Sequence, residues 1–169
     1  MTNRGSTAEP LSIRVSAGSG RGPTTLAAFD AALRSAGVAD HNLIRLSSII
    51  PAGAVVERCS PQEQLRGQFG DILYCVYSAA FATEWDEEAW SGIGWSRDSA
   101  GRGLFVEHSG QAEEHVRTLI ASSLSDMSNG RGGRFSLEDM VLSSAQCEGS
   151  PVCSVVVATY RTAGWGSND

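Results

Sequence analysis

The chain is best approached from one stretch, HNLIRLSSIIPAGA, at residues 41–54. An apolar run there ends in two hydroxyl residues, Ser47 and Ser48, and is followed closely by Pro51 and Gly53. Apolar runs that stop at proline and glycine are typical of buried strands that end in a turn. The serine pair is therefore predicted to lie at the end of a strand, where the chain turns.

A serine in such a position can cleave its own backbone. The Ser48 hydroxyl can attack the carbonyl carbon of Ser47, which moves the acyl group from nitrogen to oxygen. β-Elimination from the ester then leaves a dehydroalanine, which hydrolyses to a pyruvoyl group. The tetrahedral oxyanion needs a hydrogen-bond donor, and the Asn42 side-chain amide is a candidate. Serine pairs also occur at 122–123 and 143–144, so the dipeptide alone does not predict cleavage.

The same stretch resembles a known processing motif. NLIRLSSIIP, residues 42–51, is similar to the processing site of the pyruvoyl-dependent arginine decarboxylases, a family that makes agmatine from arginine. Upstream, SAGSG at 16–20 and residues 23–37 resemble the family's glycine-rich loop and first helix. Downstream, GLFVEHSG at 103–110 resembles the strand that carries its catalytic glutamate. The resemblance predicts a self-processing decarboxylase that acts on arginine.

The resemblance also implies a role for each matching residue. Ser48 becomes a covalent pyruvoyl group, the only cofactor, once the chain is cut after Ser47. The implied catalytic residues are Ser47, Ser48, Asn42 and Glu107. The implied substrate-binding residues are Asp30, Leu33 and His41. Asp30 matches the family's guanidinium-binding aspartate, where a carboxylate pairs with guanidinium through two hydrogen bonds; without the resemblance it would be read as a solvated helix acid.

The chemistry expected of such a site is amino-acid decarboxylation. A pyruvoyl carbonyl forms a Schiff base with the substrate's α-amine and accepts the electrons released when CO2 leaves. A proton must then reach the α-carbon, and Glu107 is the acid that the resemblance names. Apolar residues at 104–106 precede it. His108 is predicted to point to the opposite face of the strand, because side chains alternate along strands.

Three alternatives stay open. The first is the same chemistry on another amino acid, such as lysine, ornithine or histidine. It arises because His41 and Asp40 depart from the family's pattern beside its substrate pocket. A non-catalytic trimeric homologue or binding module, which keeps the fold without cleavage, is the second. The third is a nucleotide-binding enzyme, which is disfavoured because the glycine-rich loop at 18–23 lacks the Lys-Ser/Thr ending of a P-loop.

Composition narrows the remaining possibilities. The 169 residues fit a flexible polar N-terminus over residues 1–10 and one domain over residues 11–169. A net charge of −6 with scattered basic residues argues against nucleic-acid binding. No segment reaches the length of a membrane span, which predicts a cytoplasmic protein. The four cysteines show no C-x-x-C motif and no histidines at zinc-ligand spacing, so no metal site is predicted.

Helical patterns occur twice. The first helix is predicted to be capped by Thr24 or Thr25 and to stop at Gly37. Its expected apolar face comprises Leu26, Phe29, Leu33 and Ala36. The second is predicted over residues 111–127, with acidic residues in its first turn.

Strand patterns fill most of the remaining chain. Strands are predicted at 11–17, up to Leu46, at 55–56, at 71–81, as a hairpin of 90–95 with 103–108, and as a closing hairpin of 140–143 with 152–160. The order of elements predicts an α+β fold. The expected form is a layered α/β/β/α-type sandwich with a mainly antiparallel sheet, and the resemblance implies a subunit of a homo-trimer or hexamer with sites between subunits.

Overall fold

The computed structural model describes residues 9–60, 63, 65–133 and 135–166, so most of the predicted flexible N-terminus lies outside the described residues. The described chain is α+β, as predicted, and neither of its helices is long and apolar enough to cross a membrane. The elements in chain order are β1 (Ser12–Arg21), α1 (Thr25–Ser35), β2 (Asn42–Arg45), β3 (Ile49–Ile50), β4 (Val55–Arg58), β5 (Ile72–Ala82), β6 (Glu88–Arg97), β7 (Gly103–Gly110), α2 (Glu113–Asn129), β8 (Ser136–Gln146) and β9 (Val152–Ala163).

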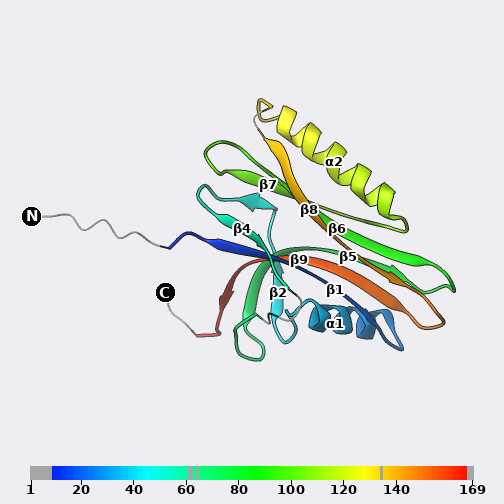
Figure 1. Cartoon of the computed structure of the whole chain (residues 1–169). Coiled ribbons are helices and arrows are strands. Elements are labelled where there is room, and N and C mark those ends of the chain that lie inside the picture. The colour runs from blue at the N-terminus through cyan, green and yellow to red at the C-terminus, as the bar shows by residue number, and fades with distance from the viewer. Residues whose placement is uncertain (1–8, 61–62, 64, 134, 167–169) are drawn as a thin grey trace, which may run out of the picture.

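The strands form two sheets (Figure 1). One has five strands in the order β2-β5-β9-β1-β4, and the other has four in the order β3-β7-β6-β8. The five-stranded sheet is mixed, because β1 pairs with β4 and β2 pairs with β5 in parallel. The described pairings of the four-stranded sheet are all antiparallel. Antiparallel pairing therefore predominates, as expected, but it is divided between two sheets.

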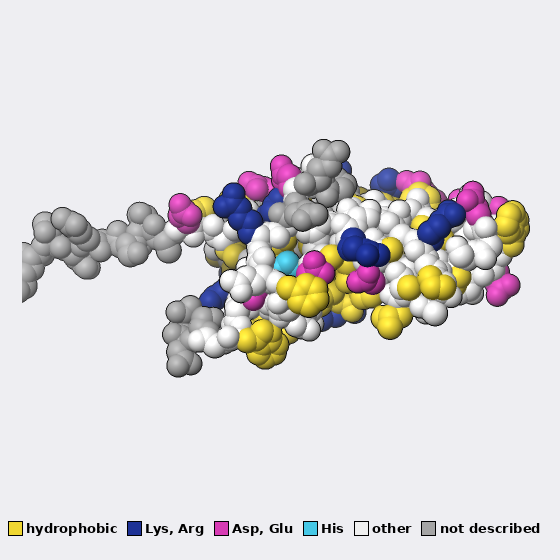
Figure 2. Space-filling model, turned by 90° about the horizontal axis from the view of Figure 1, so that it is seen from below, with side chains coloured by type: hydrophobic (Ala, Val, Ile, Leu, Met, Phe, Trp, Pro, Cys, Tyr) yellow, Lys and Arg dark blue, Asp and Glu magenta, His cyan; other side chains and the backbone are white. Residues whose placement is uncertain are grey.

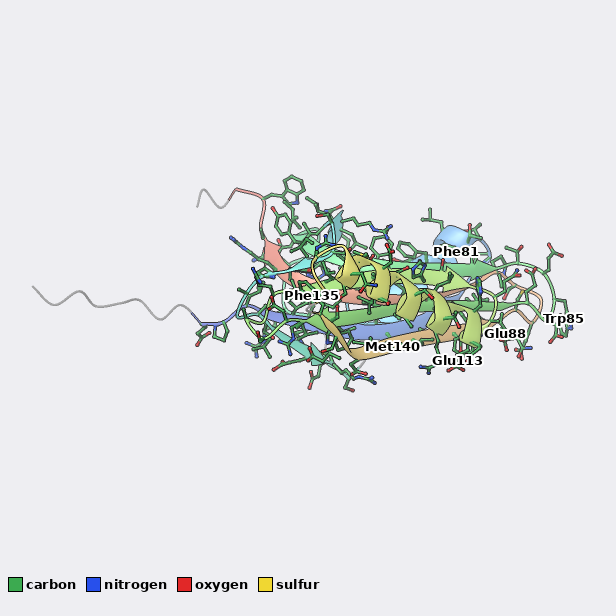
Figure 3. All side chains as sticks on the ribbon, turned by 90° about the horizontal axis from the view of Figure 1, so that it is seen from above. Phe81, Trp85, Glu88, Glu113, Phe135 and Met140 are labelled. Carbon is green, nitrogen blue, oxygen red and sulfur yellow. The ribbon has the colours of Figure 1, made fainter. Side chains whose placement is uncertain are left out.

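Buried apolar side chains join the two sheets. The cluster between them takes Val15 and Val156 from the five-stranded sheet and Trp95 and Phe105 from the four-stranded sheet. Helix α1 packs against β1 and β9, while α2 packs against β6 and β7 (Figure 1). Figure 3, which looks onto α2, shows Glu113 toward the same end of the molecule as Trp85, with Phe135 toward the other end.

Strand β1 runs further than predicted, through residues assigned to a loop at 18–23. The glycines there are needed for the close approach of α1. A Cβ atom added to Gly18 would lie 2.4 Å from the Ala36 nitrogen and 2.5 Å from the Ala32 oxygen. One added to Gly20 would lie 2.5 Å from the Ala32 nitrogen. Glycine in a strand can mark such close backbone approach, so the loop prediction was wrong for residues 18–21 and held only for Gly22 and Pro23.

Helix α1 is capped as predicted, but its buried face only partly matches the predicted one. The Thr24 hydroxyl accepts a hydrogen bond from the Ala27 nitrogen at 3.1 Å. The buried residues of the helix are Ala28 and Ala32, whereas Leu26 is 76% exposed. Because the sheet meets the helix at glycines, only small side chains fit between the two backbones. The larger residues of the predicted apolar face are displaced toward the rim and the surface.

The closing hairpin was also predicted wrongly. Strand β8 pairs with β6 in the four-stranded sheet, whereas β9 pairs with β1 and β5 in the five-stranded sheet. The short connection between them therefore passes from one sheet to the other. The burial of β9 agrees with this, since residues 152–159 are all buried, which is typical of a central strand covered on both faces. The hairpin of β6 and β7 is confirmed.

The contact between Gly18 and α1 can be tested by adding one methyl group. We expect Gly18→Ala to lower the free energy of unfolding by about 2 kcal/mol, because the new Cβ meets helix backbone, which cannot rotate away. Urea denaturation monitored by circular dichroism measures the change. Ser19→Ala is the matched control, since Ser19 is exposed on the same strand. Equal stabilities of the two variants would contradict the close approach of α1 to Gly18.

Candidate active site

The serine pair lies where the chain passes from one sheet to the other. Strand β2 ends at Arg45, one residue earlier than predicted, and β3 begins at Ile49. Residues 46–48 make the crossing, and the Leu46 nitrogen still donates to the Cys75 oxygen of β5 at 2.8 Å. The predicted turn at a strand end is thus a three-residue link between sheets.

Ser48 has an unusual backbone conformation. Its φ is +68°, in the left-handed region that residues other than glycine adopt at a cost of about 1–2 kcal/mol. The conformation is held from outside, because the Ser48 carbonyl accepts a hydrogen bond from the Phe105 nitrogen at 2.9 Å. Backbone strain that the surroundings maintain is a common feature of reactive sites.

The side chain of Ser48 is directed at Glu107. Its hydroxyl donates a hydrogen bond to the Glu107 Oε1 atom, and both residues are half-buried. The two residues are 59 positions apart in sequence. They meet because β3 pairs with β7, with Ile49 opposite Leu104, so that the segment before β3 runs beside the later residues of β7. The structure therefore brings together two of the predicted catalytic residues.

Tyr160, on β9, is a neighbour of this pair that the sequence patterns do not single out. Its hydroxyl donates a hydrogen bond at 2.9 Å to the carbonyl of Ile49, the residue that follows Ser48. Burial, followed by the negative charge of Glu107, raises the pKa of Tyr160. The hydroxyl therefore stays protonated and remains a donor. Only the stacking of the two sheets brings β9 close to Ser48. In the sequence, the one signal was a tyrosine with a polar hydroxyl at the end of an apolar strand.

Asn42 lies at the far end of β2 from the serine pair. Its side-chain amide donates to the Gly70 carbonyl at 2.7 Å. Its backbone pairs with Ile72 of β5, and the rest of β2 separates it from Ser47. Within one chain the Asn42 amide is thus directed at the segment before β5, and it is not brought to the bond predicted to be cut.

The predicted substrate-binding residues also lie away from Ser48 in the single chain. Asp30 is exposed on α1, and its carboxylate pairs with the Arg34 guanidinium at 3.2 Å. Leu33 is half-buried against the cluster between α1 and the five-stranded sheet. The His41 ring places Nδ1 2.7 Å from the Ala39 oxygen, and it lies beside Gly67. These three residues therefore gather on the α1 side of the molecule.

A groove of about 420 Å³ opens beside Ile49 and Ile50, which follow the serine pair. It lies near Phe135, which Figure 3 labels at one end of α2. Its lining residues are Ile49, Ile50, Pro51, Ala52, Arg102, Gly103, Leu104, Arg131 and Phe135. Neither Ser48 nor Glu107 lines it, so this groove does not by itself enclose the reactive pair.

The residues around Ser48 fit a serine that is converted into a pyruvoyl group. The hydroxyl follows the bond to be cut, its oxygen is oriented by Glu107, and the carbonyl on its other side is held by Phe105. Ser47, which would leave as the new carboxyl end, is exposed. These are features that self-cleavage at a serine requires, and enzymes that carry a covalent pyruvoyl group form it in this way.

Comparison with known proteins identifies the family within that class. The family model described as "Pyruvoyl-dependent arginine decarboxylase" matches residues 12–163. The match covers nearly all of the described chain. The chain therefore belongs to the pyruvoyl-dependent arginine decarboxylase family, whose members carry a pyruvoyl group made from a serine by self-cleavage.

Curated relatives agree with the family match. The pyruvoyl-dependent arginine decarboxylase of Methanopyrus kandleri is 31% identical over 160 residues, which cover 93% of this chain and 98% of the relative. Pyruvoyl-dependent arginine decarboxylase 2 of Archaeoglobus fulgidus is 33% identical over 122 residues, 68% of this chain and 76% of the relative. The protein of the same family name from Halobacterium salinarum is 42% identical over 95 residues, 56% of this chain; the match spans 58% of that relative's length.

His108 takes no part in this arrangement. It faces away from Ser48, as predicted, with its Nε2 atom 2.7 Å from the Ser123 hydroxyl of α2. Burial lowers the pKa of His108 below its usual value of 6.5; Glu107 partly opposes the shift, and His115 adds to it. His108 therefore packs between β7 and α2, on the face of β7 away from Ser48.

The lowered pKa of His108 predicts a specific pH dependence of stability. As the pH falls below 6.5, the unfolded chain binds a proton at this residue more readily than the folded chain, so the free energy of unfolding falls. We expect His108→Gln to weaken this loss while the chain is still cleaved completely. Urea denaturation on both sides of that pH, together with the mass of the denatured protein, checks both statements. An equally steep loss in the variant would contradict the assignment.

Proposed function

We propose that this chain is a cytoplasmic, self-processing decarboxylase that converts L-arginine to agmatine and CO2. The single observation that carries the proposal is the hydrogen bond from the Ser48 hydroxyl to the Glu107 carboxylate. In a chain of this family, that contact links two groups. One is the serine that becomes the pyruvoyl group, and the other is the acid that donates a proton in decarboxylation. The names of the relatives, all pyruvoyl-dependent arginine decarboxylases, support arginine as the substrate.

Self-cleavage begins at the Ser48 hydroxyl oxygen. This oxygen attacks the Ser47 carbonyl carbon, the peptide C–N bond breaks, and an ester replaces it with the Ser48 amine set free. Loss of the Ser48 α-proton expels the Ser47 carboxylate and leaves a dehydroalanine. Water then replaces the nitrogen, which departs as ammonia, and a ketone remains at the former α-carbon. The hydrogen bond to Glu107 holds the oxygen at the start of this path.

Glu107 has a second task once the chain is cut. A pyruvoyl group derived from Ser48 would supply the electron sink that decarboxylation requires. Glu107 stays on β7 beside the converted residue, where it supplies the proton that the α-carbon needs. His108 alternates to the other face of the strand and does not compete for this role.

Recognition of arginine requires a carboxylate near the far end of the substrate, and Asp30 is the proposed group. Asp30, with Leu33 and His41, lies away from Ser48 within one chain, as does Asn42. We therefore assign them to a site shared with a neighbouring subunit of a trimer or hexamer. In each subunit, the two sheets and the two helices would form α/β/β/α layers.

Exposed apolar side chains support such an assembly. Figure 2 shows apolar side chains at the surface of the face seen from the α1 side. Leu26 is 76% exposed, Phe81 45% and Ile44 42%. Apolar surface of this kind is often covered by a partner protein, and a second copy of the same chain is the commonest partner.

The proposal is tested by the mass of the denatured protein and by CO2 release. We expect two fragments, residues 1–47 and the pyruvoyl-capped residues 48–169, and release of CO2 from arginine in preference to lysine, ornithine and histidine. Ser48→Ala should give one intact chain without activity, since no hydroxyl remains to attack. An uncleaved wild-type chain would overturn the proposal and favour a non-catalytic homologue, and preference for another amino acid would reassign the substrate.

The two tasks of Glu107 can be separated with one substitution. A glutamine carbonyl can still accept the hydrogen bond from Ser48, but the amide cannot supply a proton. We therefore expect Glu107→Gln to be cleaved and to lose at least about 100-fold in kcat for arginine. Fragment masses and CO2 release measure the two effects. Full activity in this variant would exclude Glu107 as the proton donor.

A further inference from the structure

Tyr160 joins the two sheets at the cleavage segment. It lies on β9 of the five-stranded sheet, whereas Ile49, which accepts its hydrogen bond at 2.9 Å, begins β3 of the four-stranded sheet. The Tyr160 ring packs edge-on against Phe105 of β7, with ring centroids 6.1 Å apart and an interplanar angle of 71°. The ring and the hydroxyl thus contact the strand that carries Glu107 and the residue that follows Ser48.

Two successive carbonyl groups are held at this point. The Ser48 carbonyl accepts from the Phe105 nitrogen, and the Ile49 carbonyl accepts from the Tyr160 hydroxyl, both at 2.9 Å. Ser47, on the other side of the scissile bond, is exposed. The part of the segment that stays with the long chain is therefore anchored by donors from two sheets.

These anchors involve atoms that self-cleavage leaves in place. The reaction changes the nitrogen, the α-carbon and the side chain of Ser48. The Ser48 carbonyl remains an amide carbonyl, and the Ile49 carbonyl is not involved. Both acceptors are thus still available after cleavage, and the raised pKa of Tyr160 keeps its hydroxyl a donor.

We propose that Tyr160 is a positioning residue that holds the Ser48–Ile49 segment beside Glu107, first for self-cleavage and then for decarboxylation. It acts through the backbone of Ile49 and does not touch the substrate. The inference rests on the proposed function and deepens it. Loss of the hydroxyl leaves the Ile49 carbonyl without its partner and frees the segment to move away from Glu107.

The first test removes a single oxygen atom. We expect Tyr160→Phe to slow self-cleavage about tenfold, the effect of one lost hydrogen bond on a reacting geometry. After cleavage is complete, kcat for arginine falls by a similar factor while KM stays at the wild-type value. Tyr77→Phe is the matched control. It removes the same atom from a tyrosine of the same sheet, but on the side that faces α1. Wild-type cleavage and kcat in Tyr160→Phe would overturn the inference.

The second test leaves the shape of the residue intact. A tyrosine with all four ring hydrogens replaced by fluorine at position 160 has nearly the same form. Its hydroxyl is so much more acidic that it becomes a phenolate, which cannot donate, despite the surroundings that raise the pKa of Tyr160. We expect cleavage of this protein to slow as the pH rises from about 7 to about 9, whereas the unmodified protein shows no such loss. Identical pH profiles would show that the hydroxyl does not act as a donor and would overturn the inference, even if Tyr160→Phe folds poorly.

The outcome also separates this inference from the proposed function. A wild-type chain that stays whole removes both. A wild-type chain that is cleaved and releases CO2 from arginine, with Tyr160→Phe equal to it in both rates, removes only the role of Tyr160.

Discussion

The passage of the chain from one sheet to the other at residues 46–48 is the constraint on which the site depends. β2 belongs to the five-stranded sheet and β3 to the four-stranded sheet, so the link has three residues in which to change layers. The left-handed backbone of Ser48 makes the change possible. The pairing of β3 with β7 then holds Ser48 beside Glu107.

The strain at Ser48 is maintained by the packing around it. Phe105 serves twice, since its nitrogen binds the Ser48 carbonyl and its ring lies in the cluster between the sheets. Tyr160 reaches the same segment from the opposite sheet. An isolated peptide would relax out of the left-handed conformation, because it costs about 1–2 kcal/mol. The reactive geometry is therefore a property of the two packed sheets.

Sequence reasoning succeeded where a short segment carries its own signal. The Thr24 cap, the helix after residue 110, the hairpin of β6 and β7 and the alternation of Glu107 and His108 all depend on near neighbours. It failed where distant backbone decided the outcome. Gly18 and Gly20 read as a loop because their purpose, the approach of α1, is invisible along the chain. The strands β8 and β9 read as a hairpin because nothing local shows that they belong to different sheets.

The sequence alone determined the candidate reactive elements: a serine pair before a turn, a glutamate on an apolar strand, and a motif that resembles one family. These follow from residue type and close spacing, which local backbone preference turns into structure. Only the tertiary structure decided that Ser48 meets Glu107 across 59 residues, that Tyr160 joins them, and that Asp30 and Asn42 lie elsewhere in the single chain. The physical reason is that sheet register and the burial of side chains between layers set these distances, and both arise only when the whole chain packs together.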